Sequence, residues 1–531
     1  MNAIPPTVTV SRTAIYWLLL TSFGLLLSAC STTMPSQKPP GFSFMETTID
    51  DIHAAIKDQT IDCEAITNGF LNRIKKYDEI SNLNSIIYIN PNAIKEAQTL
   101  DKIYQETKMM RRLHCVPIIL KDNFDTADMP TEAGSIALSG SIPPDDAYIV
   151  KNLRQADAII IAKSNMGEWA FSPYNTISST HGETRNAYDL SRVPAGSSGG
   201  TASAIAANFG VIGMGSDTGN SIRGPASHLA LVGIRPTIGV TSRDGIVPLL
   251  LNRDIGGPLM RTVRDTAKVF NVIAGTDPAD ATTKSYEKHK VDDYTAHLTP
   301  NGLSKVRLGV LRQIYDSETA DKQILAVFTQ ALKDLESSGA VIIDPVTIPD
   351  FEELVKATGF CGRFRYDINN YLKTLGNEIE IKTLREVVEQ EKFRPENDGA
   401  MKWAMSIAAD VKPAEQNPPC IDVEGDSRRK ALLTAVVTTM DGLKLDALIY
   451  PTWSNPPRKI GDSESPHGNN SPVIAPHSGQ PAITVPMGYV ENNLPVGLQI
   501  LGRPFSEEKL FRYAYAFEQA THHRKPPLLF P

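Results

Sequence analysis

Apolar residues recur along this chain with two different spacings, and each spacing predicts a type of element. Apolar positions three and four residues apart predict helices over residues 49–56, 62–74, 91–110, 145–155, 199–208 and 222–229. Short apolar and β-branched runs predict strands over residues 84–89, 115–120, 158–162 and 209–215. Because the predicted strands and helices alternate, the pattern favours an α/β fold with a central mixed β-sheet covered by helices on both sides.

The pattern is less regular between about residues 280 and 440. Helical stretches are predicted over residues 322–338, 379–392 and 428–443, with polar loops between them. Strand character returns at residues 447–450 and 481–486, and a closing helix is predicted over residues 506–521. We therefore expect a single large domain over residues 45–531, in which residues 280–440 form a variable region that shapes a binding pocket.

The first 30 residues differ from the rest of the chain. Residues 14–27 are almost wholly apolar, and Arg12 is the only charged residue before them. This run is shorter than the about 20 residues that span a membrane, which is typical of a signal-peptide core. Its end at Ala29 and Cys30 resembles the bacterial lipobox, which implies cleavage before Cys30 and a lipid on its thiol. A plain signal peptide cut near Ala29 is the alternative.

Residues 31–44, rich in Ser, Thr and Pro at their start, are predicted to form a tether. Ser31 directly after the cysteine favours transfer to an outer membrane over retention in the inner one. We therefore expect an exported bacterial lipoprotein that is anchored by its N-terminal lipid and faces the periplasm.

Charge and cysteine content narrow the function further. The net charge is −7, which argues against broad attraction to nucleic acid. Besides Cys30 the chain contains Cys63, Cys115, Cys361 and Cys420, and no spacing of Cys and His is typical of a metal site. Export permits disulfides, so bonded pairs and four free thiols both remain open.

Two glycine-rich loops carry the candidate chemistry. Residues 194–200 contain Ser197, and residues 217–223 contain Ser221, 24 positions further along. Glycine allows positive φ and close approach of the main chain, and successive amides can converge on a developing negative charge. A serine hydroxyl needs a neighbouring base. Lys121 ends an apolar strand, where burial would keep its amine neutral.

These segments resemble the amidase-signature family of serine hydrolases, and most of all bacterial exported peptide amidases. The resemblance is carried by residues 117–123, 163–168, 184–186, 195–200, 217–226, 233–237, 451–452 and 479–486. It implies the family's α/β fold and the hydrolysis of carboxamide bonds, in a peptide C-terminal amide or another small amide, without a metal or organic cofactor.

The family implies a triad of Ser, cis-Ser and Lys. At the matching positions, Ser221 is the nucleophile that becomes acylated, Ser197 relays its proton after a cis peptide bond, and Lys121 receives it. The resemblance also implies supporting roles. The oxyanion hole would be formed by main-chain amides of Thr218, Gly219, Asn220 and Ser221, with a hydrogen bond from Ser198 and a structural ion pair of Asp217 with Arg223.

Two positions depart from the family pattern. Ala195 stands where the family has the first glycine of its serine loop, and Asn220 stands where it has the glycine before the nucleophile. The amide of Asn220 can still donate, but its side chain is expected to narrow the pocket.

Other motifs offer competing interpretations. Residues 196–200 also fit the G-x-S-x-G pattern of α/β-hydrolases, with Ser198 as nucleophile. That pattern needs a buried strand directly before it, whereas residues 186–194 are polar and end in proline. Residues 285–288 fit S-x-x-K, but they lie in a polar stretch and no K-T-G follows.

Two further residues are interpreted as structural. His181 lies in a loop rich in Ser and Thr, where it is expected to be an ordinary loop histidine, although it could edge the pocket. Glu168 is interpreted as an acid at a helix start.

The sequence thus predicts a serine amidase, active as a monomer or homodimer on a small-molecule or peptide amide. A fatty-acid amide hydrolase is an alternative, because the same triad serves it and the anchor would place the enzyme beside lipid. A glutaminase subunit of a tRNA-dependent amidotransferase is disfavoured by the signal segment. A non-catalytic binding lipoprotein is disfavoured because Lys121, Ser197 and Ser221 are all present.

Overall fold

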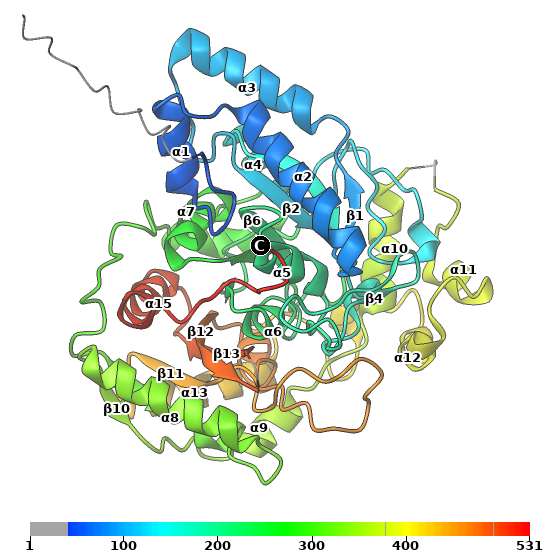
Figure 1. Cartoon of the computed structure of the whole chain (residues 1–531). Coiled ribbons are helices and arrows are strands. Elements are labelled where there is room, and N and C mark those ends of the chain that lie inside the picture. Colours follow the sequence, from blue (N-terminus) through cyan, green and yellow to red (C-terminus); the bar gives the residue numbers. More distant parts are fainter. Residues whose placement is uncertain (1–40, 377–378, 492) are drawn as a thin grey trace, which may run out of the picture. The chain divides into compact units, whose positions relative to one another are not determined.

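A computed structural model of the chain describes residues 41–376, 379–491 and 493–531 (Figure 1). The predicted signal peptide, Cys30 and the predicted tether up to residue 40 lie outside the described residues. Within the described ranges, no helix combines the length and apolar character that crossing a membrane requires.

One mixed sheet of eleven strands forms the centre of the domain. In chain order its strands are β1 (Ile86–Ile89), β2 (Pro117–Lys121), β3 (Ile159–Ser164), β6 (Ile212–Ser216), β7 (Val232–Arg235), β8 (Gly256–Met260), β9 (Arg307–Val310), β10 (Val341–Ile343), β11 (Ala447–Pro451), β12 (Ala482–Val490) and β13 (Leu494–Leu501). Their order across the sheet is β1-β3-β2-β6-β8-β7-β12-β13-β11-β9-β10. A separate antiparallel pair is formed by β4 (Ile177–Ser178) and β5 (Gly182–Glu183).

Helices flank this sheet (Figure 1). They are α1 (Ile49–Lys57), α2 (Cys63–Ser81), α3 (Ala93–Thr107), α4 (Tyr148–Gln155), α5 (Gly199–Ala206), α6 (Arg223–His228), α7 (Val263–Ile273), α8 (Lys322–Ser337), α9 (Phe351–Ala357), α10 (Phe364–Thr374), α11 (Leu384–Glu389), α12 (Asp398–Ser406), α13 (Ser427–Gly442), α14 (Ala475–Ser478) and α15 (Glu507–Thr521). Short 3₁₀ turns are η1 (Ile136–Leu138), η2 (Glu168–Ala170), η3 (Ala281–Lys288), η4 (Arg312–Ile314), η5 (Pro395–Asn397) and η6 (Pro413–Glu415). The predicted α/β class and mixed sheet are confirmed.

The centre of the sheet determines where the candidate chemistry lies. Strand β2 runs parallel to both of its neighbours, β3 and β6, and all five of its residues are buried. Helix α5 packs against β2 and β6. Because β2 and β6 are parallel neighbours, their carboxyl ends share one edge of the sheet, and the residues that follow them meet there.

Some elements differ from the prediction. The predicted helix over residues 379–392 is wrong in its extent, because α11 covers only Leu384–Glu389. Strand β8 was not predicted, since its sequence opens with two glycines and a proline. A Cβ on Gly257 would lie 2.6 Å from the Ile234 carbonyl oxygen, so this strand needs glycine to pack closely against β7.

The variable region from 280 to 440 divides into two parts. Its first part supplies β9 and β10 to the central sheet and α8 to its cover, so this part belongs to the core of the fold. A later part, from Phe360 to Ala404, contributes side chains to the wall of an apolar cavity beside the second serine loop.

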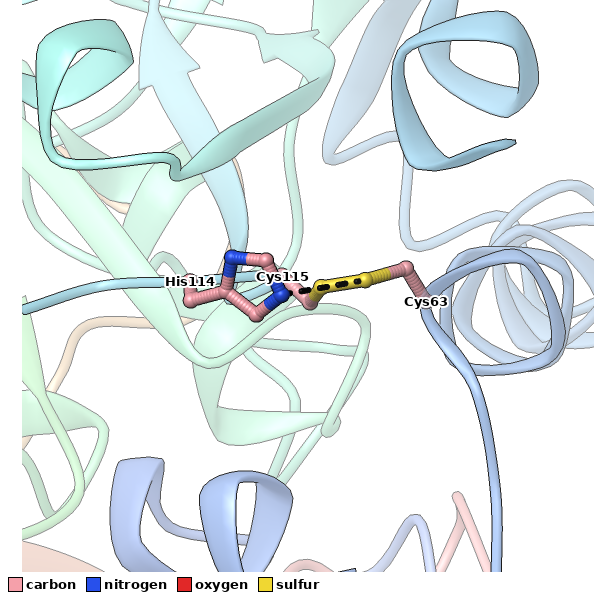
Figure 2. Close-up of side chains that lie close together, drawn as sticks. All are labelled: Cys63, His114 and Cys115. Carbon is pink, nitrogen blue, oxygen red and sulfur yellow. Dashed lines mark hydrogen bonds between the residues drawn. A yellow bond between two sulfur atoms is a disulfide. The ribbon is translucent and has the colours of Figure 1, made fainter. Parts of the chain in front are cut away.

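The sequence left open whether the four cysteines after Cys30 form disulfides, and the structure contains two. Cys63 and Cys115 are bonded across a Cα–Cα distance of 5.2 Å, and Cys361 and Cys420 across 5.6 Å. Figure 2 shows His114 beside the first pair. The His114 Nε2 atom lies 3.8 Å from the Cys63 sulfur. Since both sulfur atoms are used in the disulfide, this group does not offer three free ligands to a metal ion.

Candidate active site

Lys121 is the last residue of β2, and its side chain is fully buried. Its Nζ donates to Ser197 Oγ at 2.8 Å and to Ser216 Oγ at 2.8 Å. Burial lowers the pKa of Lys121 to about 7, against the opposing effect of the Asp217 and Asp254 carboxylates. A large share of this amine is therefore neutral near pH 7, and it lies within proton-transfer distance of a serine hydroxyl.

Ser197 lies in the loop that leads into α5, and the Gly196–Ser197 peptide bond is cis, as the resemblance implies. A Cβ on Gly196 would lie 2.1 Å from the carbonyl oxygen of Asn175, so only glycine fits there. The positive φ expected of the loop glycines is found instead at Ala195, with φ of 63°. Glycine therefore serves close main-chain approach in this loop, not a left-handed conformation.

Ser221 lies in the turn between β6 and α6, and a buried carboxylate organises that turn. Asp217 accepts from Arg223 Nε at 3.1 Å, from Arg235 Nη1 at 3.0 Å and from the Ile222 amide at 3.2 Å. Arg223 also donates to the Gly219 carbonyl oxygen at 2.6 Å. The predicted ion pair of Asp217 with Arg223 is present, and Arg235 extends it to β7, which is separated from β6 by β8 in the sheet.

The main-chain amides of residues 218–221 have no acceptor among the described residues. The side chain of Thr218 donates to Asp254 Oδ1 at 2.5 Å. Asn220 Nδ2 donates to the carbonyl oxygens of Pro173 at 3.2 Å and Gly196 at 3.3 Å, so it links the two serine loops. The four consecutive amides are thus available to a substrate.

A cavity of about 340 Å³ opens beside these amides and is lined in part by residues 218–221. Its other walls are mainly apolar, and the aromatic side chains among them are Phe171, Tyr174, Phe360, Phe364 and Trp403. None of the described side chains that line the cavity is charged. Ser198 does not line it, and its hydroxyl donates to the Ser216 carbonyl oxygen at 3.3 Å, which ties the first loop to β6.

Ser216 is a site residue that the sequence analysis missed. Its Oγ accepts from Lys121 at 2.8 Å and from Asn123 Nδ2 at 2.9 Å. The position of Ser216 directly before Asp217 was the available signal, but its contact with Lys121 depends on the pairing of β6 with β2. Arg235 was missed for a similar reason, because only strand order brings it to Asp217.

The structure also locates the competing candidates. No strand leads into Ser198 over residues 186–194, which contradicts the α/β-hydrolase interpretation. Ser285 donates to the Thr282 carbonyl oxygen at 2.9 Å. His181 lies 3.3 Å from the Glu132 carboxylate and does not line the cavity.

Glu168 begins the 3₁₀ turn η2 and is buried. Its carboxylate accepts from Ser179 Oγ at 2.5 Å, from the Arg394 amide at 2.8 Å and from Asn397 Nδ2 at 2.7 Å. Glu168 therefore connects the loop that contains Ser179 to residues 394–397, the segment directly before α12.

Comparison with known proteins supports this picture. The sequence pattern of the Amidase family matches residues 65–511. A probable amidase of Arabidopsis thaliana is 32% identical, and the alignment covers 96% of each chain. One of the subunits of the glutamyl-tRNA(Gln) amidotransferase of Gloeothece citriformis is also 32% identical, over 90% of this chain and 99% of that one.

Among solved structures, the native peptide amidase of Stenotrophomonas maltophilia superposes with a TM-score of 0.82. It is 34% identical, and the match covers 92% of this chain and 100% of the other. The chain therefore belongs to the amidase family and is a hydrolase that acts on amide C–N bonds.

Proposed function

We propose that the chain hydrolyses neutral carboxamides through an acyl-enzyme on Ser221. The observation that carries this proposal is the buried Lys121 amine, bonded at 2.8 Å to the Ser197 hydroxyl, next to a cavity that Ser221 lines. Ser221 is the nucleophile, Ser197 the proton relay and Lys121 the base. The main-chain amides of residues 218–221 form the oxyanion hole in this proposal. They donate to no acceptor among the described residues, which supports the assignment.

In the acylation step, Ser221 Oγ attacks the amide carbon, and its proton passes to Ser197 Oγ while a Ser197 proton passes to Lys121 Nζ. The carbonyl oxygen becomes an oxyanion that the loop amides stabilise. As the C–N bond breaks, Lys121 returns the proton through Ser197 to the leaving nitrogen, and ammonia departs. Water then attacks the ester by the same proton path, which releases the acid and restores Ser221.

The proposed substrate is a peptide C-terminal amide or another small amide with an apolar acyl part. The aromatic and uncharged cavity wall supports this choice. Free glutamine carries an ammonium and a carboxylate, and the described lining side chains offer neither of these groups a counter-ion. A glutaminase role is therefore less suited to this cavity, whereas a fatty-acid amide would fit its apolar character.

An amide panel tests the proposal. The purified protein is assayed for ammonia release from a peptide amide, a long-chain acyl amide and glutamine. We expect turnover of the peptide amide, and Ser221→Ala should lower kcat by at least about 10⁴-fold, as loss of a nucleophile does. Ser285→Ala is the matched control, because this serine lies outside the cavity and should retain full activity. Unchanged turnover in Ser221→Ala would refute the assignment.

We also propose that the protein is exported and anchored by a lipid on Cys30. The apolar run over residues 14–27 and the small residues before Cys30 support this proposal. Labelled palmitate should be incorporated into the full chain and should be absent from Cys30→Ser. Label that persists in this variant would contradict the anchor, and Cys420→Ser is a control that should remain labelled.

A further inference from the structure

Tyr174 and His467 form a polar pair in the mainly apolar wall of the cavity. The amide N–H of Asn469 donates to His467 Nδ1 at 3.0 Å. Because a main-chain amide can only donate, Nδ1 must be the acceptor, and the ring proton of neutral His467 is on Nε2. Burial and the nearby Arg458 lower the pKa of His467, so the neutral ring prevails at pH 7.

The direction of the next hydrogen bond follows from this tautomer. His467 Nε2 lies 3.1 Å from the Tyr174 hydroxyl oxygen, so the imidazole donates and the tyrosine accepts. The hydroxyl proton of Tyr174 must then point elsewhere, and no acceptor for it is found among the described residues. Burial raises the pKa of Tyr174, which keeps this proton in place at neutral pH. Tyr174 thus presents an oriented, unused donor in the cavity that Ser221 lines.

The chemistry of the cavity limits which substrate atom this donor can meet. In the proposed function, the scissile carbonyl oxygen binds the amides of residues 218–221. Most of the other lining side chains are hydrocarbon, and the Thr218 and Asn220 side chains already donate to protein acceptors, which leaves the Asn469 carboxamide as the other polar group of the wall. In a peptide amide, the next acceptor is the carbonyl oxygen of the preceding peptide bond. A free α-ammonium in its place has only protons to donate, and no described lining side chain is a carboxylate that could receive them.

We propose that the Tyr174 hydroxyl binds the carbonyl oxygen of the acyl group on the α-nitrogen, and so selects N-acylated amino-acid amides and peptide amides. His467 is the positioning residue that fixes the orientation of this hydroxyl. The inference rests on the proposed function and narrows its substrate class. Amides with a free α-amino group or with a plain hydrocarbon acyl group are the weaker substrates.

Two substrates that differ in this acceptor test the inference. N-acetylphenylalanine amide contains the acyl carbonyl, and 3-phenylpropanamide lacks the whole acylamino group. The measured quantity is the ratio of their kcat/KM values. Tyr174→Phe, which removes one oxygen, should lower this ratio about tenfold, the value of one hydrogen bond of about 1.4 kcal/mol. Tyr148→Phe is the control, because its hydroxyl bonds to Thr276 outside the cavity, and it should keep the wild-type ratio.

His467 variants provide the second test. His467→Phe should lower the same ratio, but by less than Tyr174→Phe does. His467→Gln retains a side-chain N–H donor, so its ratio should lie closer to the wild-type value than that of His467→Phe. A ratio unchanged in Tyr174→Phe, in a protein that still hydrolyses 3-phenylpropanamide, would overturn the inference and leave the proposed function standing. If the wild type releases ammonia from neither of the two amides, both the inference and the proposed function are overturned.

Discussion

At the scale of residues, the site depends on a lysine whose charge is suppressed by its surroundings. Lys121 has two hydroxyl partners and is fully buried at the end of a strand. The motif around residues 117–123 identified it from the sequence alone. Ser216 and Arg235 could not be found in this way, because their contacts are made between strands that lie far apart in the chain.

The first prediction concerns pH. As the proposed base, Lys121 can accept a proton only when its amine is neutral, and burial lowers its pKa to about 7. We therefore expect kcat/KM to fall as pH decreases through about 7, tenfold for each pH unit below it. Steady-state assays from about pH 5.5 to 9 measure this fall in kcat/KM, which is the acid limb of the pH profile.

A matched variant tests whether another buried group, and not Lys121, causes the acid limb. Asp125, a carboxyl group whose pKa burial also raises to about 7, bonds to Tyr371 and does not line the cavity. Asp125→Asn should retain the acid limb. A limb that disappears in this variant would assign it to the carboxyl group and contradict the lysine.

The second prediction concerns Asn220, which replaces a family glycine. Its side chain donates to two carbonyl oxygens of neighbouring loops and was expected only to narrow the pocket. Asn220→Gly should lower the free energy of unfolding by about 1–3 kcal/mol, through lost hydrogen bonds and added chain entropy. Chemical denaturation measures the loss. Asn301→Gly, in an exposed turn, isolates the entropy contribution, and an equal loss in both variants would refute the bridging role.

At the scale of elements, one disulfide lies where the cavity wall begins. Cys361 stands between Phe360 and the start of α10 at Phe364, and its bond to Cys420 holds this segment. The sequence indicated neither the pairing nor α10. Helical periodicity in this region is broken by polar loops, and the wall becomes recognisable only when separate short helices are packed together.

The third prediction uses this disulfide. The double variant Cys361→Ser with Cys420→Ser should raise KM for aromatic amides about threefold to tenfold, because Phe360 and Phe364 lose their fixed position. The matched control replaces Cys63 and Cys115, whose disulfide is in α2 and the segment before β2 and not in the cavity wall. Its KM should remain at the wild-type value. Equal changes in both double variants would indicate general loosening of the fold.

At the scale of the whole molecule, sheet order assembles the site. Lys121 and Ser216 are 95 positions apart in sequence and become neighbours because β2 and β6 pair in parallel. The α/β class and mixed sheet followed from alternating periodicities. The strand order did not, since it depends on which edges pair after the chain has folded. Single-chain activity and the monomer or homodimer state stay predictions from the sequence.

The fourth prediction concerns the stability of the domain. The two disulfides close loops with sequence separations of 52 and 59 residues. In the chain-entropy description, each such bond stabilises the folded state by about 4 kcal/mol. A reductant that opens both should therefore lower Tm markedly in thermal unfolding. Titration of the free thiols confirms that both disulfides have been reduced. If the reduced and the oxidised protein then have the same Tm, this expectation is contradicted.

The uncharged wall of the cavity has a consequence for the end of the catalytic cycle. Hydrolysis converts a neutral amide into an anion, and none of the described side chains that line the cavity is a cation that could pair with it. The acid is therefore held less tightly than the amide from which it forms. Product release is thereby favoured over rebinding, so accumulated acid should inhibit only at concentrations well above the KM of the matching amide.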